Sequence, residues 1–163
     1  MALWFSATAV VPSLEAEFSI GAAQASLLTS AVQVGFVFGT LSSAILGLAD
    51  RVDPRRFFMA SALLATAANS AILAIDPAGS TIIVLRLITG ACMAGVYPLG
   101  MKMAATWVKN DMGLLIGILV GALTLGSAAP HLFNAFGGID WRFTVITGST
   151  GSFAAAILIN LFR

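Results

Sequence analysis

The sequence predicts an all-α integral membrane protein, and three observations support that prediction. Hydrophobic residues make up 59% of the 163-residue chain and charged residues only 9%, whereas a soluble domain carries roughly 25% charged residues. The apolar stretches are continuous, unlike the alternating pattern of transmembrane β-strands. The charges also leave long gaps, which are residues 1–14, 18–49, 57–75, 87–101, 112–139 and 143–162. Because roughly 20 apolar residues cross a bilayer as a helix, six spans account for almost the whole chain.

We expect a single domain, a six-helix transmembrane bundle over residues 1–163. The predicted helices cover residues 1–12, 21–49, 54–75, 81–107, 112–136 and 142–162. Only 11 residues precede Pro12, too few to span, so we expect the first helix to be truncated at its start. Asp53 and Pro54 form the pattern of a helix N-terminus, a capping side chain followed by a first-position proline. Pro98 is expected to kink the fourth helix.

The basic residues predict the orientation in the membrane. The loops after the second, fourth and sixth helices hold most of them, namely Arg51, Arg55, Arg56, Lys102, Lys109 and Arg163. The positive-inside rule places such loops in the cytoplasm. We therefore expect a multi-pass protein of the inner (plasma) membrane with both termini in the cytoplasm.

The composition argues against several kinds of partner and chemistry. Eight basic and seven acidic residues give a net charge of +1, so no nucleic-acid partner is expected. A lone cysteine, Cys92, excludes an internal disulfide and a cysteine-based metal site. No phosphate-binding glycine loop is present, so no cofactor is expected. The segment 148–151 does not match a membrane serine protease, and no channel filter sequence is present, so an enzyme or a channel is disfavoured.

The segment from Gly47 to Arg56, GLADRVDPRR, resembles the signature loop between the second and third helices of the major facilitator superfamily. Asp50, Arg51, Arg55 and Arg56 stand at matching positions, whereas Leu46 and Asp53 replace the usual glycines. Arg86 with Gly90 resembles the family's fourth-helix motif. The glycines and proline of residues 113–130 resemble its fifth-helix motif.

This resemblance implies the N-terminal half of a twelve-helix transporter, built from two inverted three-helix repeats. Such a half would transport a small solute by alternating access together with a second six-helix half, or as a homodimer, in the lipid bilayer. The alternative is a non-transporting six-helix fragment or a self-pairing membrane protein.

The loop of Asp50, Arg51, Arg55 and Arg56, called the gate loop below, has two interpretations. Its arginines could serve only as a positive-inside anchor. The resemblance implies instead a gate that locks one face against the other half. We favour the gate, because an anchor has no need of the Asp50 carboxylate.

Four residues are candidates for lining a substrate cavity. Arg86 and Tyr97 would share one face of a continuous fourth helix, although Arg86 could instead extend to the headgroups. Gln33 could contact substrate or bond a neighbouring helix. Trp4 could line the cavity or lie in the aromatic belt at the membrane surface. A single arginine in the cavity would favour an anionic solute.

A further set of residues is expected to pack helices closely, because small residues let backbones approach within a membrane. They are Gly35, Gly39, Gly90, Gly117, Gly121 and Pro130. The only histidine, His131, could couple protons, but we favour a packing or interfacial role.

Overall fold

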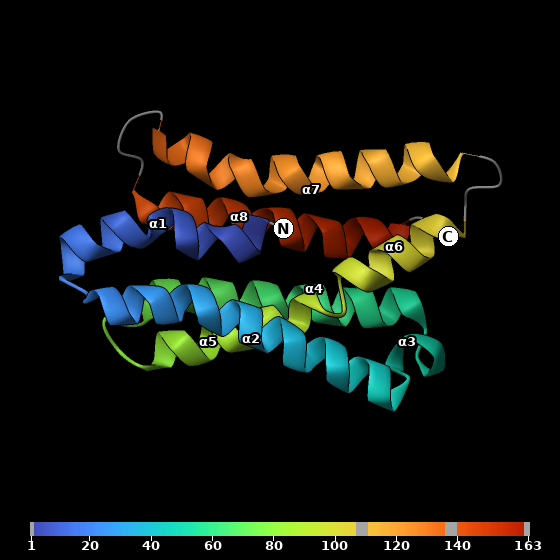
Figure 1. Cartoon of the computed structure of the whole chain (residues 1–163), viewed down its shortest axis with the longest axis horizontal. Helices are drawn as coiled ribbons and strands as arrows, with labels where there is room; N and C mark the ends of the chain where they lie inside the picture. The colour runs from blue at the N-terminus through green and yellow to red at the C-terminus, as the bar shows by residue number, and fades with distance from the viewer. Residues whose placement is uncertain (1, 107–110, 136–139, 162–163) are drawn as a thin grey trace.

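The apolar stretches form long helices that lie side by side and alternate in direction along the chain (Figure 1). The computed structural model describes residues 2–106, 111–135 and 140–161, and every regular element in these ranges is helical. The elements are α1 (Ala2–Phe18), α2 (Ala22–Leu46), α3 (Leu48–Arg51), α4 (Pro54–Ala71), the short 3₁₀ turn η1 (Ile72–Ala74), α5 (Thr81–Met93), α6 (Tyr97–Ala105), α7 (Met112–Ala135) and α8 (Trp141–Leu161).

Five helical segments in the described ranges are long and apolar enough to cross a membrane. They are Ala22–Leu46, Pro54–Ala74, Thr81–Ala105, Met112–Ala129 and Trp141–Leu161. The helix α1 has 17 residues and begins near the middle of the bundle's long axis (Figure 1). The expected end of this helix at Pro12 is wrong, because α1 continues through Pro12 to Phe18. Pro12 removes one backbone donor, and a helix packed among other helices tolerates that loss.

The start of α4 confirms the predicted cap. The Asp53 carboxylate accepts hydrogen bonds from the backbone N–H groups of Arg55 (2.9 Å) and Arg56 (3.2 Å), and Pro54 occupies the first turn. The preceding helix α2 ends at Leu46, earlier than the expected residue 49. Gly47 takes a left-handed conformation there (φ 60°), which costs a glycine little. The four residues of α3 follow and carry the gate loop's Asp50 and Arg51.

The expected fourth helix, residues 81–107, is interrupted within the described part. The helix α5 ends at Met93, α6 begins at Tyr97, and a turn separates them. Pro98 has no N–H to donate to the Ala94 carbonyl, and its ring fits only the first turn of a new helix. The discontinuity therefore lies one turn before Pro98. Residues 107–110 and 136–139, where two of the expected helices end, are outside the described ranges.

Glycines bring α2 and α5 into direct backbone contact. A Cβ atom at Gly35 would overlap the carbonyl oxygen of Leu87, and one at Gly90 would overlap that of Val32. A Cβ at Gly39 would likewise meet the backbone of Ala91. These three glycines are thus placed as the sequence predicts.

The expectation for Gly117 and Gly121 is corrected by the structure. A Cβ at either position would meet nothing within 4 Å, because this side of α7 faces away from the other described helices. Small-residue spacing indicates that a face permits close packing, but not which helix packs there. Pro130 lies within α7, and its side chain is outside the described set.

Substituting these glycines should separate the two cases. We expect Gly90→Leu to destabilise the bundle by about 1–3 kcal/mol or more, because the added side chain must displace the backbone of α2. Gly117→Leu is the matched control and should leave the apparent Tm in detergent unchanged. Thermal unfolding monitored by size-exclusion chromatography measures both variants, and equal Tm values would contradict the packing described here.

Candidate functional site

A cavity of about 440 Å³ lies between four helices beside the start of α1. We call it the aromatic cavity, and its lining residues are Trp4, Phe5, Gln33, Phe36, Tyr97, Leu123, Thr124 and Ser127. They come from α1, α2, α6 and α7. The fold thus brings together three of the four residues that the sequence proposed for a cavity, namely Trp4, Gln33 and Tyr97.

Aromatic rings form one side of this cavity. The rings of Trp4 and Phe36 meet edge to face, with centroids 5.1 Å apart and planes at 69°. Phe5 lies beside Trp4, with ring centroids 6.4 Å apart. The contact between Trp4 and Phe36 joins α1 to α2 and fixes the position of the indole.

The polar groups of the cavity differ in whether they are already bonded. Thr124 donates its hydroxyl to the Val120 carbonyl (2.9 Å), and Ser127 donates to the Thr124 carbonyl (2.7 Å). The Gln33 amide and the Tyr97 hydroxyl have no hydrogen-bond partner among the described residues, and Gln33 is exposed. These two groups remain available to a ligand.

Arg86 lies in neither of the two places that the sequence suggested. Its side chain is 0% exposed, so it neither lines the cavity nor extends to the headgroups. Its guanidinium donates to the carbonyl oxygens of Leu3 (3.2 Å) and Trp4 (2.7 Å). Arg86 and Tyr97 would share a face only on a continuous helix. The turn between α5 and α6 interrupts the helix between them, so the helical spacing no longer relates their positions.

A buried polar network surrounds Arg86. The Asn69 Oδ1 atom accepts from Arg86 (3.3 Å) and from the Ser6 hydroxyl (3.3 Å). The Asn69 Nδ2 atom donates to the Val145 carbonyl (3.3 Å) and the Ser149 hydroxyl (3.0 Å). The network therefore ties α1, α4, α5 and α8 together. No carboxylate pairs with Arg86 in the part of the chain that the structure describes, and its Nε has no partner there.

Sequence reasoning missed Asn69, Ser6 and Ser149. The sequence does carry a signal for Asn69, because it is the one amide side chain within the charge-free stretch 57–75. A lone amide in an apolar span needs an internal partner, because lipid offers none. The sequence does not show which helix supplies that partner.

The gate loop is bonded to α6 through one ion pair. Lys102 donates to the Asp50 carboxylate (2.5 Å) and to the Ala49 carbonyl (3.1 Å). This hydrogen bond and the positive charge of Lys102 hold the pKa of Asp50 below its usual value of 3.8. The side chains of Arg51, Arg55 and Arg56 are exposed and make no ion pair with described residues.

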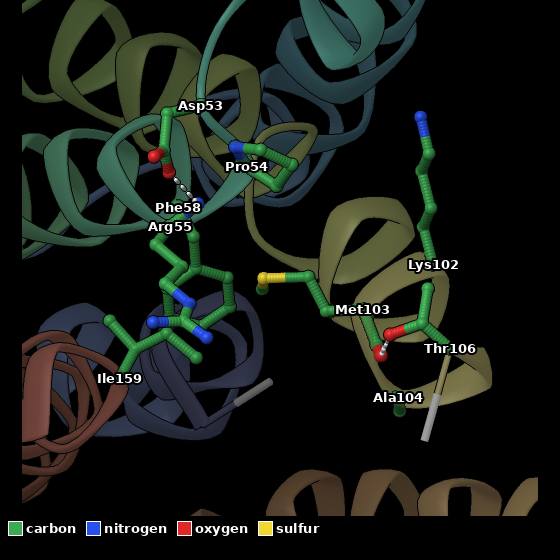
Figure 2. A pocket seen from close by; sticks show the side chains of 10 residues that line it. Asp53, Pro54, Arg55, Phe58, Lys102, Met103, Ala104, Thr106 and Ile159 are labelled. Carbon is green, nitrogen blue, oxygen red and sulfur yellow. Dashed lines mark hydrogen bonds between the residues drawn. The ribbon is translucent and has the colours of Figure 1, made fainter. Parts of the chain in front are cut away.

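A second, larger cavity of about 730 Å³ adjoins the gate loop. Its walls include Phe58 of α4, Met103 of α6 and Ile159 of α8. In Figure 2, Arg55 extends along the same side as Phe58 and Ile159, whereas the Lys102 ammonium group points away from the centre. Most of the lining residues are apolar, and the lining also includes the charged residues Asp53, Arg55 and Lys102.

A further cluster joins α1 to α8 at the opposite end of the bundle. Trp141 donates its indole N–H to Glu17 (2.8 Å), and Arg142 pairs with Glu17 (3.4 Å) and Asp140 (3.3 Å). The Arg142 guanidinium also lies 4.7 Å from the centre of the Trp141 ring. This cluster holds the end of α1 against the start of α8. His131 is exposed and is not among the residues that line the aromatic cavity.

Comparison with known proteins decides the family. Residues 1–163 match the Major Facilitator Superfamily. The chain belongs to the major facilitator superfamily. Its all-helical bundle with five membrane-crossing segments in the described ranges is consistent with this family of transporters.

The chain is also similar to a protein of Buchnera aphidicola subsp. Schizaphis graminum (strain Sg) that is named as an uncharacterized transporter. The two sequences are 28% identical over 127 residues, which cover 77% of this chain. The matched part covers 30% of the relative's length. No solved structure is significantly similar to the chain.

The Arg86 network predicts a difference between two arginine substitutions. Arg86→Lys keeps the charge but loses the planar fork that reaches several oxygens, and each buried group left unsatisfied costs roughly 1–3 kcal/mol. We expect the apparent Tm to fall by several degrees. Arg55→Lys is the matched control, because Arg55 is exposed. A Tm for Arg86→Lys equal to that of Arg55→Lys would show that the network adds no stability.

The ion pair between Asp50 and Lys102 predicts the reactivity of Lys102. Because the folded-state pKa of Asp50 is lowered, the pair is intact above the usual carboxyl pKa and is lost only as the pH falls through the lowered value. Across the neutral range we expect Asp50→Asn to raise labelling of Lys102 by an amine-reactive ester several-fold, read by mass spectrometry. Asp53→Asn removes the same charge without touching Lys102 and should not. High salt should act like Asp50→Asn, because exposed pairs are screened.

Proposed function

We propose that the chain is the N-terminal six-helix half of a secondary transporter that moves a small solute across the inner membrane by alternating access. The observation that carries the proposal is the aromatic cavity, which gathers side chains as distant in sequence as Trp4 and Ser127. Membership of a transporter family supports the general activity. A partly apolar cavity with a few unbonded polar groups is typical of a small-molecule site.

The need for a second half is supported by length. The matched region covers 30% of the relative. In transporters of this general design the solute binds between two bundles that rock against each other, and one bundle supplies one wall. A second copy of the chain is the other candidate for the opposite wall. We place both termini and the gate loop in the cytoplasm, because the exposed Arg51, Arg55 and Arg56 cluster at that end.

In this proposal the gate loop acts as a conformational latch. Asp50 is bound to Lys102 of α6, and α6 also presents Tyr97 to the aromatic cavity. A movement of α6 would therefore affect the gate and the cavity together. The exposed arginines of the loop are free to contact the opposite half when the cytoplasmic side closes.

Cysteine labelling tests the cavity and the orientation in one assay. In a Cys92→Ala background, Ser127→Cys should react with a hydrophilic maleimide, because a solute pathway must admit water. Leu125→Cys is the matched control on the same helix: Leu125 is 72% exposed on the side that would face lipid, so it should not react. Asp76→Cys should be labelled from outside intact cells, and Asp111→Cys only after permeabilisation.

Two outcomes would contradict the proposal. If labelling of Ser127→Cys is as low as that of the lipid-facing control Leu125→Cys, the cavity is closed to water. Solute counterflow catalysed in proteoliposomes by a monomer of the chain would show that no second half is needed.

A further inference from the structure

We propose that the aromatic cavity binds an uncharged solute that carries a ring and a hydrogen-bonding edge, such as a carboxamide. This inference rests on the proposed function and specifies its substrate class. It departs from the anion that a cavity arginine would have favoured.

The first support is the charge of the cavity. None of its eight lining residues is charged. The cation of α5, Arg86, is fully buried and does not line the cavity, and its guanidinium is bonded to Leu3, Trp4 and Asn69. A charged ligand that enters the cavity loses its contacts with water and meets no opposite charge among these lining residues. Burying an unpaired charge is costly.

The second support is the shape and chemistry of the apolar wall. Half of the lining residues are aromatic: Trp4, Phe5, Phe36 and Tyr97. Trp4 and Phe36 already meet edge to face, and Trp4 is only half-buried. Aromatic rings favour further edge-to-face or offset-stacked partners over aliphatic groups of equal area. A planar ring is therefore preferred to an aliphatic one.

The third support is the pattern of unbonded polar groups. Gln33 offers two donors and an acceptor, and Tyr97 offers one hydroxyl. The hydroxyls of Thr124 and Ser127 donate to their own helix and keep only acceptor capacity. A carboxamide or lactam edge pairs with both a donor and an acceptor of Gln33. A lipid chain would leave these groups unpaired at a cost.

The experiment measures protection of Ser127→Cys from the maleimide in the Cys92→Ala background, with four small probes. Benzamide is neutral and aromatic, benzoate is its anionic analogue, benzylamine is cationic at neutral pH, and cyclohexanecarboxamide is neutral without an aromatic ring. We expect benzamide to slow labelling several-fold and the other three to slow it much less.

Two substitutions connect the protection to the cavity. Gln33→Leu should abolish protection by benzamide. Gln33→Glu has the same shape with a negative charge and should shift the preference from benzamide to benzylamine. Asn160→Leu, an exposed polar position on α8, is the control and should change nothing. Size-exclusion chromatography checks that each variant remains folded.

Each other result overturns the inference. Stronger protection by benzoate would restore an anionic substrate, and equal protection by cyclohexanecarboxamide would remove the aromatic requirement. If Ser127→Cys reacts readily but no probe protects it, the substrate class is wrong while the water-filled cavity stands. If Ser127→Cys is as unreactive as Leu125→Cys, the proposed function itself fails.

Discussion

A buried cation with no counter-ion among the described residues is the constraint on which much of this bundle depends. Arg86 lies inside a membrane-crossing segment, where a charged side chain costs about 2.5–3.5 kcal/mol even on permissive scales. In the part of the chain that the structure describes, neutral oxygen atoms rather than a carboxylate offset this cost. The carbonyls of Leu3 and Trp4 and the amide of Asn69 must all approach one guanidinium. That requirement fixes α1 and α4 against α5.

The packing of α2 against α5 lies next to this network. Gly90 comes one turn after Arg86 on α5, and at Gly90 the backbone of α5 contacts that of α2 at Val32. Gly35 and Gly39 on α2 complete a contact between backbones rather than side chains. The network also reaches α8, because Asn69 bonds to Val145 and Ser149. By contrast α7 has none of these polar or glycine contacts with the described residues, and its exposed leucines and isoleucines suit a lipid-facing position.

The sequence predicts local features of this fold better than the relations between its helices. The Asp53 cap, the glycine contact of α2 and the apolar spans depend on residues near one another in the chain, so their spacing is informative. The sequence predicts a cavity position for Arg86 because Tyr97 lies 11 positions later, at a spacing that shares a face of a continuous helix. The helix is interrupted one turn before Pro98, so this spacing no longer places Arg86 and Tyr97 on one face.

The separation of Arg86 from Tyr97 has a consequence for function. The buried charge of Arg86 is committed to holding α1, α4 and α5 together, so changing it would disturb the fold as well as any pathway. Chemistry in the aromatic cavity is left to neutral groups, chiefly Gln33 of α2 and Tyr97 of α6. Tyr97 begins α6, just after the turn that disconnects this helix from α5. Arg86 and Tyr97 therefore lie on opposite sides of one backbone discontinuity. In the proposed mechanism α6 moves together with Lys102, while the buried Arg86 stays in place.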